Sequence, residues 1–496
     1  MSLGLTSRFN ILERSPYDLD PLKPEPAIAA TPQKRGWTPS RYTLRAATAD
    51  GGLVLWNTSS GKLSLFNARL ASLVQAILKT HGASTEPEAL VQFLAARGFI
   101  VPQGTDELRR FRFAFGEQHH AKDRLQLFLL ASEDCNLRCT YCYEDFPRGT
   151  MSPWVRDAVK KYLAKRVPAL SQFTLEWFGG EPLYGFEAIA DIAPFACDLV
   201  ERHNVRYLSK ITTNAYLLTP EVFEQLLAWK VLSYQITVDG PAEHHDRSRP
   251  GRDGSPTFER IFSNLKAMHD RPGSFAVMLR MNFDRDNHHE LGRLLDLVTT
   301  DLERDPRFRL SFRPVGQWGG PNDRALNVCA PDEAIDNQLL LEEEARKRGL
   351  LLAGSIHHSG GLGAQVCYAS RPYSFIIGAS GKVMKCTIDL DRRDRNVVGR
   401  IDEQGTLHLD QDKMAMWTEP AFESDPKCRK CVILPSCQGM SCPLERWDEH
   451  RSPCPSIRST YKRHMRRAAA ESRARQAGAE SAAAGLPASS SHFPPQ

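Results

Sequence analysis

The middle of the chain alternates between two hydrophobic periods, which predicts strands followed by helices. Six short apolar runs recur between residues 125 and 312, and stretches with helical spacing lie between them. The runs are 125–130, 173–178, 207–211, 234–238, 276–282 and 308–312. Repeats of this kind predict an α/β fold with a parallel sheet, open or curled into a partial barrel.

A polar or glycine-rich stretch follows each predicted strand. In chain order these stretches are 135–142, 179–182, 212–214, 239–240, 283–286 and 313–316. Parallel sheets bind ligands at the carboxyl ends of their strands, so we expect one site built by six loops on one rim. Further rim positions that could place a substrate are Arg280, Asn282, Asp284, Arg313, Gln317 and Trp318.

Residues 42–118 show a different pattern, which predicts a small winged-helix-like domain. Apolar residues at 53–57 and 62–66 flank a Ser/Thr/Gly turn, as in a hairpin, and helical spacing follows at 70–78 and 90–94. Winged-helix domains often bind DNA, but the second predicted helix has few basic residues, so its phosphate-binding potential is small. A peptide-binding or purely structural role fits this segment at least as well.

Both ends of the chain lack hydrophobic periodicity. Residues 1–41 are rich in Pro, Ser, Thr and charge, and residues 461–496 are rich in Ala, Arg and Ser, so we predict that both are disordered. The 64 basic and 59 acidic residues give a net charge of +5, which is too small to imply a nucleic acid or an anionic membrane as partner.

The cysteines are the unusual feature of the composition. No apolar run approaches the about 18 residues of a membrane span, and the chain starts without a secretory pattern, so we expect a reducing cytoplasm. The 12 cysteines then need an explanation other than disulfides. Cys197 lies in an apolar helical pattern and is expected in the core, whereas ten others fall in two groups that indicate metal or redox chemistry.

The first group is Cys135, Cys139 and Cys142. Three cysteines within eight residues can hold three irons of a cubane cluster and leave the fourth iron open for chemistry. Zinc favours four ligands, often supplied as CxxC pairs, so this spacing fits an iron–sulfur cluster better than zinc.

At this point the chain resembles the radical SAM superfamily. The resemblance rests on the CxxxCxφC motif with Tyr141 as its aromatic residue, on the Gly-Gly-Glu-Pro stretch after the second strand, and on the order of the other rim stretches. It implies a partial (β/α)6 barrel over 119–330, whose [4Fe-4S] cluster binds S-adenosylmethionine and cleaves it to a 5′-deoxyadenosyl radical.

The same resemblance assigns residues around S-adenosylmethionine. Gly179, Gly180 and Glu181 would hold the methionyl ammonium, since glycines allow close backbone approach and the carboxylate offsets the charge. It also implies that Thr213, Asn214 and Asp239 lie near the ribose and that Tyr141 lies near the adenine.

Residues 331–460 resemble the SPASM extension of radical SAM enzymes, which carries auxiliary iron–sulfur clusters. The resemblance implies one complete cluster on Cys428, Cys431, Cys437 and Cys454. It implies three ligands of another cluster in Cys367, Cys386 and Cys442, although four residues separate Cys437 from Cys442 where the family usually has three. The fourth position of that cluster would be open to a substrate donor, or Cys329 would fill it. A structural zinc ribbon at the four-cysteine set is the competing interpretation.

SPASM relatives act mostly on ribosomally made peptides or protein side chains, and some carry a winged-helix element that binds a leader peptide. We therefore predict that residues 42–118 recognise a leader by strand addition. The leading hypothesis is a peptide maturase that installs a crosslink or other oxidative modification, with a flavodoxin- or ferredoxin-type electron donor.

Two alternatives stay open. One is an enzyme with the same core that acts on a folded protein, as sulfatase maturases do, or on a small molecule. Relatives that oxidise sulfatases carry an Asp base directly after the second SPASM cysteine, whereas here the candidate base Asp389 lies three residues after Cys386. The other is an iron–sulfur regulator that binds DNA, which would leave the six-loop rim unexplained. No phosphate-binding GxxxxGK[ST] motif is present, so nucleotide hydrolysis has no support.

Overall fold

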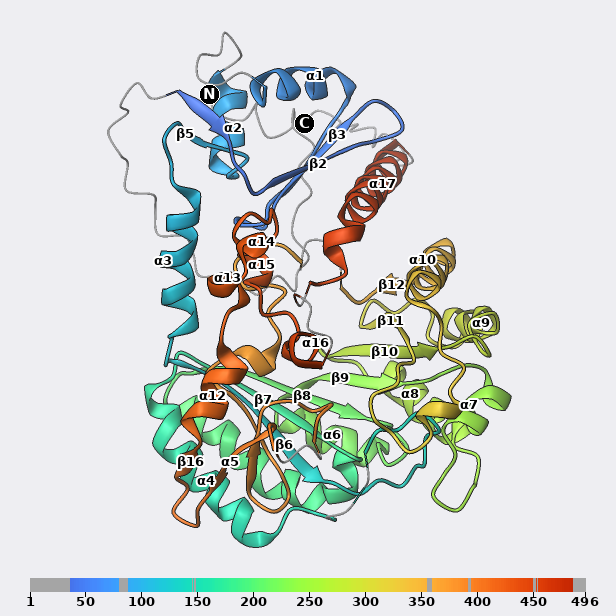
Figure 1. Ribbon diagram of the computed structural model, residues 1–496. Coiled ribbons are helices and arrows are strands. Elements are labelled where there is room, and N and C mark those ends of the chain that lie inside the picture. The colour runs from blue at the N-terminus through green and yellow to red at the C-terminus, as the bar shows by residue number, and fades with distance from the viewer. Residues whose placement is uncertain are drawn as a thin grey trace, which may run out of the picture. The chain divides into compact units, whose positions relative to one another are not determined.

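The six apolar runs form six consecutive parallel strands in the computed structural model of the protein (Figure 1). The structure describes residues 36–79, 88–144, 146, 149–354, 359–390, 394–448, 452 and 454–484. The strands are β6 Arg124–Ser132, β7 Gln172–Gly179, β8 Arg206–Thr213, β9 Val231–Thr237, β10 Ala276–Phe283 and β11 Phe308–Pro314. At the two ends of this run, β6 also pairs with β13 and β11 also pairs with β12. The two end strands therefore do not pair with each other, and the run stays open. The predicted α/β fold with a parallel sheet is confirmed.

Helices connect these strands and cover one face of the sheet (Figure 1). They are α4 Pro153–Arg166, α5 Phe186–Arg202, α6 Pro220–Ala228, α7 Ala242–Ser248, α8 Phe258–Asp270, α9 Leu291–Asp301 and α10 Pro331–Lys347. On β10, Val277, Leu279 and Met281 are buried, whereas Met278 and Arg280 between them are partly exposed. This alternation places Val277, Leu279 and Met281 on one face and Met278 and Arg280 on the other.

The sheet continues beyond the predicted barrel. β13 Ser374–Ile377 adds parallel to β6, with Ser374 opposite Gln126. The strands β14 Lys382–Met384, β15 Val397–Ile401 and β16 Leu407–Leu409 follow antiparallel, and β12 Leu351–Leu352 pairs with β11. Residues 119–353 and 367–419, which include α12 Gln411–Thr418, therefore form one compact unit. The predicted boundary after residue 330 was wrong, because later strands complete the same sheet.

The other compact unit combines the described residues within 1–118, 354–366 and 420–496. The predicted hairpin and helices are present in its N-terminal part. Its elements there are β1 Trp37–Pro39, β2 Thr43–Ala47, β3 Leu53–Asn57, β4 Leu63–Phe66, α1 Ala68–Ile77, α2 Glu88–Ala96, β5 Ile100–Pro102 and α3 Glu107–His119. β1 pairs with β5, so ordered structure begins within the segment 1–41 that was predicted to be disordered; residues 1–35 lie outside the described residues.

The C-terminal part of this unit is helical, with α13 Ala421–Ser424, α14 Pro426–Arg429, α15 Leu434–Cys437, α16 Pro443–Asp448 and α17 Ile457–Ala484. The prediction of disorder after residue 460 was wrong for α17. Met465, Ala468 and Ala469 form a narrow apolar stripe, buried in one core with Trp56 and Leu44. An Ala- and Arg-rich composition favours helix as well as disorder, and only packing distinguishes the two. Neither α17 nor any other described helix is long and apolar enough to cross a membrane.

Candidate active site

The three-cysteine loop follows β6 and is tied to a second segment of the same unit, residues 248–252. Leu137 forms an antiparallel bridge with Gly251. Backbone N–H groups donate across this contact from Arg138 to Pro250 (2.8 Å), from Thr140 to Ser248 (2.8 Å) and from Arg252 to Asn136 (2.8 Å). The course of the loop is therefore fixed by the chain's own hydrogen bonds.

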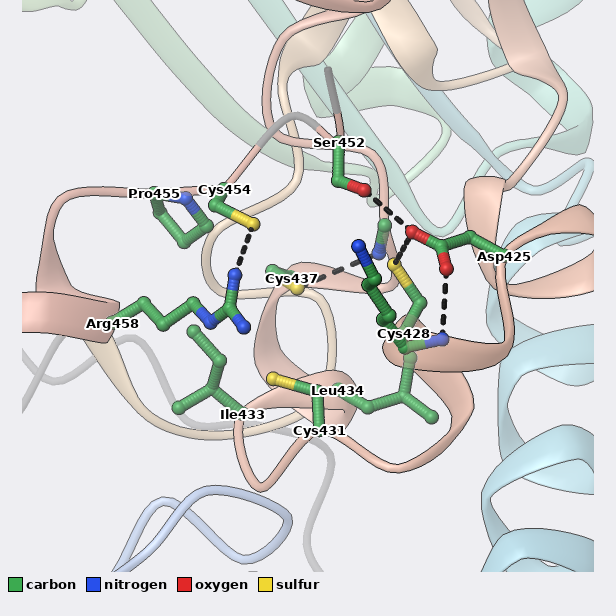
Figure 2. Close-up of a pocket in the computed structure, with 12 residues that line it drawn as sticks. Asp425, Cys428, Cys431, Ile433, Leu434, Cys437, Ser452, Cys454, Pro455 and Arg458 are labelled. Carbon is green, nitrogen blue, oxygen red and sulfur yellow. Dashed lines mark hydrogen bonds between the residues drawn. The ribbon is translucent and has the colours of Figure 1, made fainter.

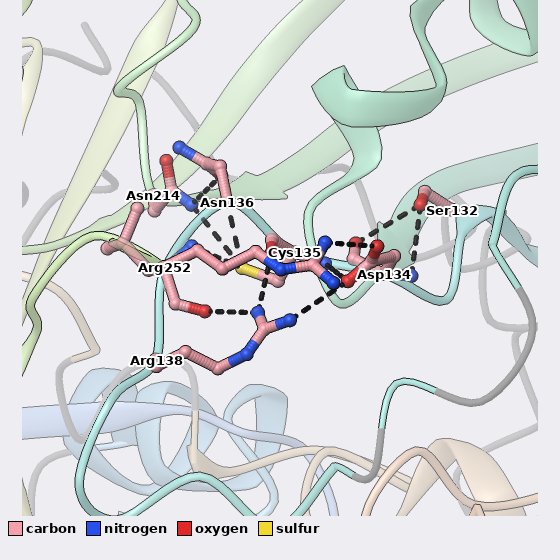
Figure 3. A network of polar contacts seen from close by, with 8 residues as sticks. Ser132, Asp134, Cys135, Asn136, Arg138, Asn214 and Arg252 are labelled. Atoms are coloured by element: carbon pink, nitrogen blue, oxygen red, sulfur yellow. Dashed lines mark hydrogen bonds and ion pairs between the residues drawn. The ribbon is translucent and has the colours of Figure 1, made fainter. Parts of the chain in front are cut away.

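Asp134 organises the start of this loop, as Figure 3 shows. Its Oδ1 accepts the backbone N–H of Cys135 at 2.7 Å and lies 3.3 Å from Arg138 Nη2, while Oδ2 lies 3.0 Å from Arg252 Nη1. Arg138 Nη1 also donates to the carbonyl oxygen of Cys135 at 2.6 Å. Two cations and one carboxylate thus hold the first cysteine in place.

The thiols of this loop suit an iron–sulfur cluster. All three are free, and Cys135 is buried. Burial raises the pKa of the Cys139 thiol and raises that of Cys142 to about 12, so the metal-free thiols are neutral and lose protons when iron binds. Three soft sulfur donors in one fixed loop match the donor set of a cubane cluster.

The predicted glycine loop packs directly on the backbone of the cysteine loop. Gly179 has φ of +120°, and a Cβ there would lie 2.0 Å from the Ser132 carbonyl oxygen. A Cβ on Gly180 would lie 2.6 Å from the Asp134 carbonyl oxygen. Only glycine fits either position, so these residues are needed to join the first two rim loops.

Glu181 links two rim loops from a fully buried position. Its carboxylate accepts hydrogen bonds from the Leu183 N–H (2.9 Å), the Thr213 Oγ1 (2.7 Å) and the Asn214 N–H (2.7 Å). Burial raises the pKa of Glu181, and these donors oppose that effect. Both oxygens are engaged within the protein, and the expected contact with a methionyl ammonium stays a prediction.

The Asn214 side chain faces the cysteine loop. Its Nδ2 donates to Asn136 Oδ1 at 2.9 Å and lies 3.7 Å from Cys135 Sγ (Figure 3). Its Oδ1 accepts the backbone N–H of Tyr216 at 2.9 Å. The side-chain amide of Asn214 therefore connects the rim stretch 212–214 with the cysteine loop 135–142.

Tyr141 and Asp239, which were predicted to lie near adenine and ribose, contact each other. The Tyr141 hydroxyl donates to Asp239 Oδ2 and accepts from Arg249 Nη1 (2.6 Å) and Asn282 Nδ2 (3.0 Å). Asp239 Oδ1 accepts the Asn282 N–H at 2.9 Å, and Arg249 lies 3.8 Å from Asp239. Burial raises the pKa of Tyr141 well above its usual value. Arg249 was missed in the sequence, because no motif around it marks a buried arginine.

Two histidines and a cysteine outside the cysteine loop are also buried in this unit. His244 and His245 both lie in α7, and His245 Nδ1 accepts the Asp239 N–H at 3.3 Å. Cys197 is buried in α5 and its Sγ donates to the Trp229 carbonyl oxygen at 2.9 Å. Cys197 is thus the core residue that its apolar pattern predicted.

The four cysteines of the predicted complete auxiliary cluster line one pocket of the other unit (Figure 2). They are Cys428, Cys431, Cys437 and Cys454. Arg458, on the first turn of α17, donates to Cys454 Sγ at 2.9 Å, and the Gly439 N–H donates to Cys437 Sγ at 3.5 Å. Burial raises the pKa of Cys428 and of Cys437 to about 12. The pocket brings together four soft donors, the basic residues Arg458 and Lys427, and Asp425. Which metal it holds stays a prediction.

The remaining predicted ligands are divided between the units. Cys367 and Cys386 belong to the unit of the parallel sheet and Cys442 to the other, so this set stays a prediction. Cys329 accepts from Asn337 of α10 at 3.7 Å.

Asp389, the candidate base, forms a bidentate ion pair with Arg395 at 2.7 and 2.9 Å. Asn396 donates to the carbonyl oxygens of Asp389 (2.8 Å) and Cys386 (2.9 Å). Both carboxylate oxygens of Asp389 are engaged by the guanidinium, which favours a structural role in the loop around Cys386.

Comparisons with known proteins point to one superfamily. A family model described as the Radical SAM superfamily matches residues 129–298. A cysteine-type anaerobic sulfatase-maturating enzyme of Clostridium perfringens is 30% identical over 332 residues, which span 62% of this chain and 86% of that protein. The mycofactocin maturase MftC of Mycobacterium tuberculosis is 25% identical over 323 residues, which span 62% of this chain and 75% of that protein.

A solved structure is also similar in fold. Native anSMEcpe with bound AdoMet and Cp18Cys peptide superposes with a TM-score of 0.53 at 18% identity, over 70% of this chain and 96% of that one. Fold, cysteine loop and relatives together define an enzyme that uses an iron–sulfur cluster at the rim of a parallel sheet. The chain belongs to the radical SAM superfamily. The family implies a [4Fe-4S] cluster and S-adenosylmethionine.

Proposed function

We propose that this enzyme is a maturase that modifies a ribosomally synthesised precursor peptide, installing a crosslink or another oxidative modification. One observation carries the proposal. The same chain contains the rim with the three-cysteine loop in one unit, and a small sheet with a four-cysteine pocket in the other unit. A relative named as the mycofactocin maturase, MftC, supports the proposal.

Cys135, Cys139 and Cys142 would hold the cluster, and the rim loops with Gly179, Gly180, Glu181, Thr213, Asn214, Asp239 and Tyr141 would surround S-adenosylmethionine. When bound, the cluster and S-adenosylmethionine would supply the radical chemistry that removes a hydrogen atom from the peptide. The chain's own task is then to hold the peptide hydrogen in place and to exclude water, for which buried rim loops joined by hydrogen bonds are suited. A flavodoxin- or ferredoxin-type protein would supply the electron, and the auxiliary cysteines would hold two further clusters.

The precursor's leader segment would add as a strand to the edge of β2. In the β2–β3 pair, Thr58 N–H donates to the Tyr42 carbonyl oxygen and Thr48 N–H to that of Gly52. Hydrogen-bonded pairs alternate in antiparallel sheets, so the N–H and C=O of Arg45 point away from β3. Arg45 is exposed, and its backbone offers the donor and acceptor that a leader strand requires.

The first experiment is coexpression of the enzyme with each short reading frame that adjoins its gene. Mass spectrometry should find one peptide whose mass falls by that of two hydrogen atoms, only when Cys135 is intact. If every adjoining peptide keeps its mass in the presence of active, iron-loaded enzyme that cleaves S-adenosylmethionine, the peptide-maturase proposal is wrong.

Deleting residues 42–101 would not test leader binding. Trp56 and Leu63 share a core with Cys437 and Met465, so the deletion would also open the four-cysteine pocket. Instead, Arg45→Pro removes the outward N–H and leaves the bonds to β3 intact, whereas Arg45→Ala keeps that N–H. Leader affinity should fall at least about tenfold in R45P and stay near wild type in R45A. Equal affinity of both variants would exclude strand addition at β2.

The second candidate is a protein-side-chain maturase of the sulfatase type. The 30% identical Clostridium perfringens relative, named for cysteine-type sulfatase maturation, favours it. Incubation with a sulfatase-derived peptide that carries the target cysteine separates the candidates. Conversion of that cysteine to formylglycine would support the second candidate, and an unchanged cysteine beside a modified adjoining peptide would support the first.

A further inference from the structure

We propose that Asn214 is a positioning residue that raises the reduction potential of the cluster held by Cys135, Cys139 and Cys142, through an N–H···S hydrogen bond to Cys135. The proposal rests on the cluster that the family implies and not on the identity of the peptide substrate. The Asn214 Nδ2 lies 3.7 Å from Cys135 Sγ, and both residues are 6% exposed.

The orientation of the Asn214 amide is fixed by its other contacts. The backbone N–H of Tyr216 requires an acceptor, and Asn214 Oδ1 occupies that position at 2.9 Å. The NH₂ group must then face Asn136 Oδ1, at 2.9 Å, and Cys135 Sγ. Rotating the amide by half a turn would put N–H against N–H at Tyr216, so the sulfur receives a donor.

The backbone of Asn214 is also held in place. Its N–H donates to Glu181 Oε2 at 2.7 Å, and Thr213 Oγ1 both donates to Glu181 Oε1 (2.7 Å) and accepts the Ala215 N–H (2.9 Å). Ala215 adopts φ of +61°, which closes the turn. The buried Glu181 thus gives a rigid base from which the amide reaches Cys135. Asn214 lies 79 residues from Cys135 in sequence, so only the fold creates this contact.

Hydrogen bonds to cluster sulfurs and exclusion of solvent are among the factors that set the potential of iron–sulfur clusters. A donated N–H places partial positive charge beside a thiolate, which stabilises the added electron of the reduced cluster more than it stabilises the oxidised form. The Leu137 backbone N–H also lies 3.4 Å from Cys135 Sγ, but only a proline would remove it, and Leu137 also forms the bridge with Gly251 that holds the loop. Asn214 is therefore the donor that mutagenesis can test.

The test is a redox titration of anaerobically reconstituted holoenzyme, followed by EPR. The signal of interest is the one whose shape changes when S-adenosylmethionine is added. Asn214→Ser keeps an oxygen that accepts the Tyr216 N–H and is too short to reach Cys135. The midpoint potential should become more negative in N214S. It should fall further in the nearly isosteric N214D, which also loses the donor and adds a negative charge.

Asn264→Ala is the matched control. Asn264 Nδ2 donates to the carbonyl oxygen of Ala215 at 2.8 Å, so it supports the same turn without touching Cys135. N264A should leave the potential of this cluster unchanged. An unchanged potential in N214S and N214D, or an equal shift in N264A, would overturn the proposal. If N214S fails to take up iron, N214D and N264A still decide between the two outcomes.

Discussion

A full positive charge lies beside the cysteine loop, away from water. The Arg249 side chain is 9% exposed and Asp239 only 1%, and their ion pair shares the Tyr141 hydroxyl. By contrast, Arg252 pairs with Asp134 from a side chain that is 59% exposed. Arg249 and Arg252 therefore bind the same loop, but Arg249 has lost far more of its contact with water than Arg252 has.

Arg249→Gln should lower the free energy of unfolding of the apo-protein by about 3 kcal/mol, because it leaves the buried carboxylate of Asp239 without a cation. Arg252→Gln, the matched control, should cost less than about 1 kcal/mol, since exposed ion pairs contribute little. Anaerobic urea titrations of both variants measure the difference. Similar costs for both would contradict the role of burial.

Tyr42 is a buried residue whose ionisation should affect stability. Its hydroxyl has no hydrogen-bond partner among the described residues, and burial raises its pKa from 10.0 to about 12. The unfolded chain ionises from pH 10 and the folded one only near 12, so deprotonation favours unfolding across this range. The wild type should lose about 2 kcal/mol more than Tyr42→Phe between these pH values. At neutral pH, Y42F should be as stable as wild type or up to about 1 kcal/mol more stable. Denaturant midpoints at pH 7, 10 and 12 measure both effects, and parallel curves would contradict the assignment.

At the scale of elements, α17 stabilises the unit that holds the four-cysteine pocket. Its buried stripe packs on β2 and β3, and Arg466 and Arg473 contact β2 and the turn after it through Ala47, Thr48 and Asp50. Its first turn supplies Arg458 to Cys454. One helix thus connects the small sheet with the predicted metal ligands.

Met465→Ala should lower the free energy of unfolding of this unit by about 2–5 kcal/mol, since Met465 is fully buried and its removal leaves a cavity. Lys462→Ala, at an exposed position of the same helix, should change it by less than about 0.5 kcal/mol. Trp56 lies in the same core, so tryptophan fluorescence during denaturation reports on it. An equal effect of both substitutions would show that α17 does not pack there.

At the scale of the whole molecule, the two cysteine groups of highest density belong to different compact units. The loop of Cys135 is in the unit of the parallel sheet, and the four-cysteine pocket is in the other. Sites that share no residues should bind their metals independently.

Replacing Cys135, Cys139 and Cys142 with Ala should remove about four irons per chain, the content of one cubane cluster, and abolish cleavage of S-adenosylmethionine. Replacing Cys428, Cys431, Cys437 and Cys454 should remove about four others, and the two losses should add. Iron and sulfide analysis of reconstituted protein measures this. Full iron content and one bound zinc in the quadruple variant would instead support the zinc ribbon.

Much of the fold could be predicted because its signals are local. The apolar runs of β6 to β11 and the hairpin of β3 and β4 each lie within a short stretch of sequence. The contacts that were missed join distant residues, such as β13 with β6 or Met465 with Trp56. Secondary-structure propensity and hydrophobic periodicity describe one short segment at a time, so they carry no information on such pairings. The pairings depend on which apolar surfaces and strand edges the rest of the chain leaves uncovered.

The sequence by itself predicted an iron–sulfur cluster at the first cysteine loop, because three soft donors within eight residues fit such a cluster whatever surrounds them. It also determined the rim order, because parallel strands put their carboxyl ends on one edge. Only the tertiary structure decided that Glu181 serves as a buried anchor, that Arg249 meets Tyr141 and Asp239, and that Asn214 reaches Cys135. Hydrogen-bond partners of buried groups depend on directions and distances of a few ångströms, which only the packed chain fixes.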